Sequence, residues 1–129
     1  MQQRDVNVAG LEVTLLENIP KIDGEFYYLA SPYGDRNPEV VEGRMNVFEY
    51  TDARLSSLGH FTWSPLDKHY KLKQMNLPGD YNYWKHYCIA MLKKSVGLIV
   101  ITQLGWDTAP GVQDEIEKAK KFGLPIYYV

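Results

Sequence analysis

The feature that most constrains the fold is an apolar run at residues 96–101, followed by a loop and then by a helical pattern. An uninterrupted run of this kind is typical of a strand buried on both faces of a parallel sheet. Residues 116–123 resemble the body of a helix that ends in lysines and a glycine. Residues 105–115 therefore lead from the carboxyl end of a central strand into a helix, which is where open α/β sheets bind ligands.

Four residues of this stretch suggest a site. Pro110 suits the first helical position, and Thr108 is a plausible cap before it. Gly111 and Glu115 share one helix face, so a ligand could approach the carboxylate past the glycine, near amides that favour anions. A carboxylate at the edge of a sheet–helix crevice is a candidate nucleophile or base. The alternative is an acid that only stabilises the start of its helix.

The rest of the chain alternates strands and helices, which predicts a parallel sheet with helices on both faces and right-handed crossovers. The strand ends would bring three groups of side chains to one crevice, and Tyr28 could reach the carboxylate. The expected strands are 26–30, 60–64, 96–102 and 125–129. The expected helices are 37–57, one capped by Asp80, and 110–122, and a long loop spans 67–79. The three groups of side chains are Ser31, Tyr33 and Asp35, then Pro65, Asp67 and His69, then Thr108, Gly111 and Glu115.

Composition excludes several classes. With 129 residues, a net charge of −2 and no basic run, the chain is one domain and a poor electrostatic partner for nucleic acid. Its one cysteine, Cys88, excludes an internal disulfide. No segment reaches the roughly 18 apolar residues of a membrane helix, and no signal peptide is evident, so we expect a cytoplasmic protein. Residues 1–25 form an arm before the domain at 26–129, with a possible edge strand at 11–15 and a turn at 19–24.

Most familiar catalytic arrangements are missing. His60, His69 and His86 lack metal-ligand spacing, and no GxSxG, Walker A or GxGxxG motif occurs, so we expect neither a metal nor a cofactor. Cys88 falls on the apolar face of its helix and is expected to pack rather than react. A carboxylate, a tyrosine, aromatic walls and a helix start suit displacement at an oxocarbenium-like carbon, as in glycoside transfer.

Three motifs in order resemble the nucleoside 2-deoxyribosyltransferases and their relatives, the 2'-deoxynucleoside 5'-monophosphate N-glycosidases. They are Tyr-Leu-Ala-Ser-Pro-Tyr at 28–33, Ser-Pro-Leu-Asp-Lys-His at 64–69, and Gly-Trp at 105–106 with Gly111 and Glu115. The resemblance covers roughly residues 26–129 and is closest to a small branch that carries the same first motif. It implies an α/β fold, a flavodoxin-like three-layer sandwich with a four- to five-stranded, mainly parallel sheet.

The resemblance also implies roles for individual residues. Glu115 would attack the anomeric carbon of a nucleotide, and Tyr28 would orient it. His69 would contact the base, and Tyr33 would wall it. Arg44 matches a position that is commonly arginine in this branch, although a surface helix cation is the alternative. Substrate-binding residues would then include Ser31, Tyr33, Arg44, Asp67, His69, Thr108 and Gly111.

The sequence departs from the family at three positions. Ala109 stands where monophosphate hydrolases have a phosphate-binding serine and transferases have an aspartate. Cys88 replaces an aspartate near the leaving group, so Asp67, Asp80 or His86 would have to supply a proton, and Val96 replaces another acid. We expect a nucleotide N-glycosidase that assembles as a homodimer or larger. A nucleotide-binding module without catalysis and a base-exchanging deoxyribosyltransferase are the alternatives.

Overall fold

The computed structural model describes residues 7–8, 11–67 and 81–129. Within them, four parallel strands form one sheet in the order β4-β3-β5-β6. The strands are β3 (Phe26–Ala30), β4 (Phe61–Trp63), β5 (Leu98–Val100) and β6 (Ile126–Tyr128). The helices are α1 (Pro38–Ser57), α3 (Tyr81–Lys94) and α4 (Pro110–Lys121).

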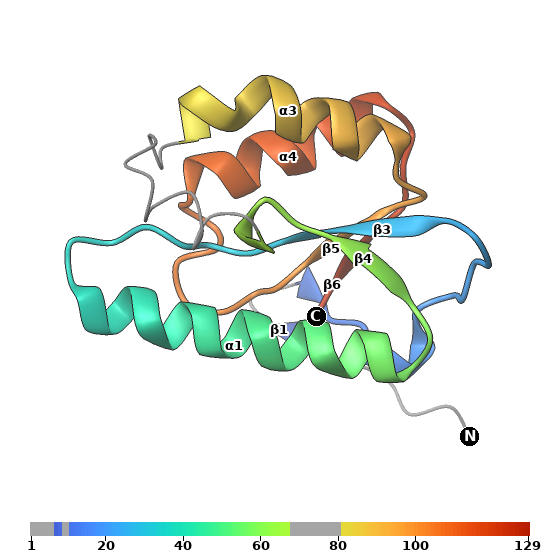
Figure 1. Cartoon of the computed structure of the whole chain (residues 1–129), viewed down its shortest axis with the longest axis horizontal. Helices are drawn as coiled ribbons and strands as arrows, with labels where there is room; N and C mark the ends of the chain where they lie inside the picture. Colours follow the sequence, from blue (N-terminus) through green and yellow to red (C-terminus); the bar gives the residue numbers. More distant parts are fainter. Residues whose placement is uncertain (1–6, 9–10, 68–80) are drawn as a thin grey trace.

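The layers and strand order confirm the expected fold class. Helix α1 covers one face of the sheet, whereas α3 and α4 lie side by side on the other (Figure 1). The chain starts its sheet at β3, adds β4 on one side, and then crosses back to place β5 and β6 on the other. This order is that of a flavodoxin-like sandwich, in which the change of direction leaves a crevice at the strand carboxyl ends.

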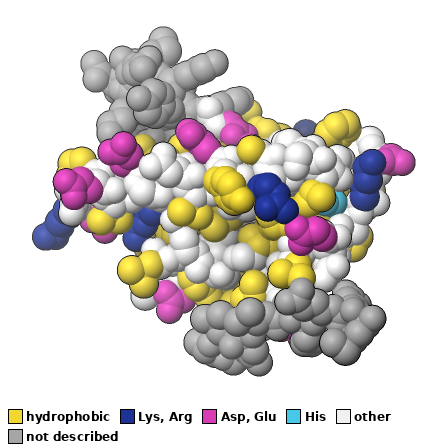
Figure 2. Space-filling model, turned by 90° about the horizontal axis from the view of Figure 1, so that it is seen from below, with side chains coloured by type: hydrophobic (Ala, Val, Ile, Leu, Met, Phe, Trp, Pro, Cys, Tyr) yellow, Lys and Arg dark blue, Asp and Glu magenta, His cyan; other side chains and the backbone are white. Residues whose placement is uncertain are grey.

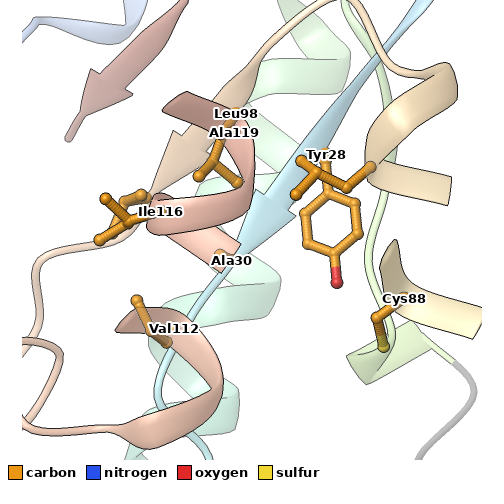
Figure 3. Packing of buried hydrophobic residues seen from close by; sticks show 9 residues of the cluster. Tyr28, Ala30, Cys88, Leu98, Val112, Ile116 and Ala119 are labelled. Atoms are coloured by element: carbon orange, nitrogen blue, oxygen red, sulfur yellow. The ribbon is translucent and has the colours of Figure 1, made fainter. Parts of the chain in front are cut away.

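Alternation along β3 separates two cores. Tyr27 and Leu29 face α1, whereas Tyr28 and Ala30 face α3 and α4, because successive side chains of a strand point to opposite sides. All four side chains are at most 2% exposed. A strand that is covered on both faces of its sheet needs apolar side chains at successive positions, and the run at 96–101 is apolar for this reason. Figure 3 shows the cluster on the α4 side, with Tyr28, Val112 and Ile116 around β3.

Element boundaries follow the predictions with small differences. Helix α1 begins after Asn37, whose side chain accepts a hydrogen bond from the Glu39 amide at 3.0 Å, as a helix cap does. The strands are each shorter than predicted, apart from β3. The long loop predicted at 67–79 and the cap predicted at Asp80 lie outside the described residues, except for Asp67.

The possible edge strand predicted at 11–15 is present only at residues 11–12. Strand β2 (Leu11–Glu12) pairs antiparallel with β1 (Asn7–Val8), apart from the central sheet. The arm meets that sheet through a single described backbone bond, from the Thr14 amide to the Tyr128 carbonyl at 2.6 Å. The turn predicted at 19–24 is present, and Gly24 has the positive φ of 76° that the turn requires.

Candidate active site

Glu115 lies on α4 and is only 4% exposed, although its side chain is a carboxylate. The Tyr28 hydroxyl, reaching from β3, donates a hydrogen bond to Glu115 Oε2. The two residues thus come from adjacent layers, the central strand and the helix that covers it. Tyr28 is fully buried, so this pair is fixed by the same packing that holds the helix on the sheet.

A cavity of about 630 Å³ opens beside this pair. Glu115 lines it, together with residues from the loops that follow β3, β4 and β5. Its position at the carboxyl ends of the parallel strands is where the strand order predicts a ligand site. The predicted site residues that line the cavity are Ser31, Tyr33, Asp35, Arg44, Pro65, Thr108, Gly111 and Glu115.

Burial controls the protonation of the pair. Desolvation raises the pKa of Glu115 to about 8, the Tyr28 hydrogen bond opposes this shift, and the charge of Asp114 adds to it. Burial, followed by the Glu115 charge, raises the pKa of Tyr28 far above its ordinary range. The tyrosine therefore remains a hydrogen-bond donor at any working pH, while the carboxyl changes its charge near pH 8.

Gly111 lines the cavity, but the side on which a Cβ would stand is filled by an aromatic ring rather than left open. A Cβ on Gly111 would lie 3.0 Å from Cδ1 of Tyr81 and 3.1 Å from its Cγ. The Tyr81 ring packs there because its hydroxyl donates to Asp114 Oδ2 at 2.8 Å, which ties the start of α3 to α4. The glycine thus admits an aromatic ring, and the ring forms part of the cavity wall.

Thr108 does not cap α4. The N-cap residue is Ala109, which offers no side-chain acceptor, and the Thr108 hydroxyl lies 3.4 Å from the Gly105 carbonyl, as the donor of a long bond. The helix begins one residue later than a Thr108 cap would require, with Pro110 at its first position as predicted. The start of α4 therefore has no side chain of its own on its free amides.

Three other predicted site residues either do not line the cavity or lie outside the described residues. Asp67 is exposed, does not line the cavity, and accepts a hydrogen bond from the Ser64 amide at 3.2 Å. Although the residue as a whole is exposed, its carboxyl is partly desolvated, and this desolvation, followed by the charge of Asp52, raises its pKa. His86 is exposed on α3 and does not line the cavity either. His69 lies outside the described residues.

Cys88 packs as predicted but also borders the site. It is 1% exposed, lines the cavity, and its thiol is a hydrogen-bond partner of Tyr28. Figure 3 shows the Tyr28 hydroxyl directed toward the side of the cluster that Cys88 occupies. Burial raises the pKa of the thiol to about 11, so it is neutral at physiological pH.

Aromatic walls were expected from the sequence, but apart from Tyr33 the residues that form them were not identified. Trp63 lies with its ring centroid 5.4 Å from that of Tyr28 and stacks on Tyr87 at 5.5 Å with an interplanar angle of 28°. Tyr81 and Trp84 line the same side of the cavity. The helical spacing of 81, 84 and 88 could have placed these α3 residues on one face, next to the predicted carboxylate.

Among the residues that the structure describes, no three His, Cys, Asp or Glu side chains gather as a metal site would require. None of the described helices has both the length and the apolar character needed to cross a bilayer.

The fold and the site together define a flavodoxin-like α/β protein with a buried, tyrosine-bound carboxylate at the carboxyl ends of its strands. The chain belongs to the family described as "Domain of unknown function (DUF1937)", whose model matches residues 25–129. No curated protein matches the chain.

Proposed function

We propose that the protein is an N-glycosidase that releases the base from a deoxynucleoside 5'-monophosphate, with Glu115 as the nucleophile. The observation that carries the proposal is the buried Glu115 carboxyl, hydrogen-bonded to Tyr28 and facing a cavity with aromatic walls. A nearly solvent-free carboxylate that is held by one donor suits attack at a carbon where positive charge develops.

The reaction proceeds in two displacements. The ionised Glu115 carboxylate bonds to the anomeric carbon, the carbon–nitrogen bond breaks, and its electron pair leaves with the base, which takes up a proton. Water then attacks the same carbon of the glycosyl ester, gives up a proton, and restores the carboxylate. The sum is nucleotide plus water giving free base and sugar phosphate. Tyr28 holds the carboxylate in line throughout.

The cavity lining combines the kinds of group that such a substrate needs. The rings of Trp63, Tyr81, Trp84 and Tyr87 suit stacking on a base. The lining also contains the polar side chains of Ser31 and Thr108, the Arg44 cation and the first residues of α4. A helix start and a cation both favour an anionic phosphate. The substrate would thus span the cavity with its anomeric carbon beside Glu115.

The direct test is a panel of deoxynucleoside and ribonucleoside monophosphates and the corresponding nucleosides, with free base followed by chromatography. We expect base release from at least one deoxynucleoside monophosphate and slower release from its nucleoside. Binding by calorimetry without release would instead favour a nucleotide-binding module. Transfer of the sugar to an added free base faster than hydrolysis would favour the deoxyribosyltransferase.

We also propose that the protein is a homodimer or larger assembly. Helix α1 carries an exposed apolar stripe of Val40, Val47 and Tyr50, which are 36%, 41% and 65% exposed. Figure 2 looks onto the α1 side of the molecule and shows apolar side chains among charged ones. We expect light scattering at micromolar concentration to give the mass of at least two chains. Tyr50→Glu should reduce that mass, whereas Tyr83→Glu, on exposed α3 surface, should not.

A further inference from the structure

Two polar side chains connect the loop after β3 to the loop after β5. Gln103, in the second loop, donates from Nε2 to the Ser31 hydroxyl at 2.7 Å in the first. The same amide donates to the Arg44 carbonyl on α1 at 3.1 Å. Because Ser31 lines the cavity and Gln103 does not, the glutamine acts on the site from behind its wall.

Arg44 makes the second connection. Its Nη1 donates to the Gly34 carbonyl at 2.7 Å and also contacts the Tyr33 carbonyl at the longer distance of 3.4 Å. Both carbonyls belong to the first loop. Its Nη2 points to the Leu104 carbonyl of the second loop at 3.4 Å. A Cβ on Gly105 would collide with Nη2, and Gly105 has a φ of 98°. The second loop therefore depends on glycine for its backbone conformation at a point where it lies against the guanidinium.

The donors of Arg44 are largely committed to the protein itself. An arginine has five N–H donors, and three of the contacts that Arg44 makes are to backbone carbonyls. Nε is buried and has no partner in the described part of the chain. Because the carbonyl acceptors come from both loops, removal of the guanidinium would free each loop from the other.

We infer that Arg44 and Gln103 are positioning residues that tie these two loops together and thereby set the width of the cavity between the two loops. This inference rests on the proposed function. Ser31, Tyr33 and Gly34 line the cavity from one loop and Gly105 from the other, so their separation decides how closely a substrate is held. The tie acts on binding in the ground state and the transition state alike, and it leaves Glu115 and Tyr28 in place.

The test compares Arg44→Met and Gln103→Leu with Arg54→Met, a control on the same helix whose arginine pairs with Glu17 at 2.8 Å, away from the cavity. With the nucleotide that the enzyme hydrolyses, we expect both test variants to raise KM by about tenfold and to change kcat by less than about threefold, because uniform binding is lost. Hydrogen exchange of the free protein should accelerate in residues 31–36 and 102–106 in both variants, and not in the control.

Other outcomes would overturn the inference in distinguishable ways. A raised KM in Arg44→Met alone, with unchanged exchange in both loops, would make Arg44 a direct ligand of the substrate. Unchanged exchange in both variants would remove the tie altogether. If the wild-type protein hydrolyses no nucleotide, the proposed function fails, while the exchange measurement still decides whether the two side chains hold the loops. Gln103→Leu keeps the test decisive if Arg44→Met does not fold.

Discussion

Glu115→Gln is expected to lower the rate of base release by at least about a thousandfold while the protein stays folded. An amide cannot form the glycosyl bond, but it has nearly the shape of the carboxyl and still accepts the hydrogen bond from Tyr28. The measurement is kcat for the best nucleotide of the panel. Glu117→Gln is the matched control, because it makes the same chemical change at an exposed position on the same helix. Equal activity of the wild type and the Glu115 variant would refute the nucleophile.

The same substitution should stabilise the protein, and increasingly so at high pH. Burial raises the pKa of Glu115 from 4.5 to about 8, so the folded chain binds this proton more tightly than the unfolded chain. The resulting stabilisation is fully present below about pH 4.5 and is lost as the pH rises through about 8. The amide variant has no such loss. Urea unfolding should therefore give the variant a higher free energy of unfolding than the wild type, and the difference should widen by a few kcal/mol between pH 4.5 and pH 9. Glu117→Gln should show no such widening.

The rate of base release should depend steeply on pH. Attack requires the ionised carboxylate, and the raised pKa leaves most of Glu115 neutral at pH 7. We expect kcat/KM to rise by nearly tenfold per pH unit well below pH 8, by about fiftyfold between pH 6 and pH 8, and then to level off. A profile that is flat from pH 6 to pH 9 would contradict a buried Glu115 as the group that must ionise.

Tyr28→Phe tests what sets the pH at which this rise in kcat/KM levels off. The tyrosine hydrogen bond lowers the pKa of Glu115 against the effect of burial, so its removal should move the rising limb to higher pH. We expect kcat/KM at pH 7 to fall by about ten- to a hundredfold, since both ionisation and alignment are lost. Tyr27→Phe is the control on the same strand. Its hydroxyl donates to the Pro20 carbonyl at 2.5 Å on the opposite face of the sheet, so the rising limb should not move.

The sequence predicted those features that depend on the hydrophobic pattern of a segment or on the residues at the start of a helix. The apolar run at 96–101 predicted a central strand, and the strand–helix alternation predicted the layers. Asn37 and Pro38 predicted the start of α1, because a cap and a proline act on the chain next to them. The contact between Tyr28 and Glu115 was also foreseen, since the strand end and the helix start had to meet in one crevice.

What the sequence did not predict depends on contacts between distant segments. The ring that fills the space beside Gly111 comes from Tyr81, thirty positions earlier, and is fixed there by Asp114. Gln103 has no local pattern that points to Ser31. Asp67 is a local exception, because its side chain turns back to accept a hydrogen bond from the nearby Ser64 amide and lies outside the cavity. Position after a strand locates a loop, and only packing decides where its side chains point.

Ala119 connects the chemistry to the core. It lies four residues after Glu115 on the same face of α4, is 0% exposed, and packs with Leu98 of β5 (Figure 3). Any larger side chain there would push the helix outward from the sheet, and Glu115 would move away from Tyr28 with it. Under the proposed function, a single increase in volume at this position would therefore abolish base release while every polar residue of the site is retained.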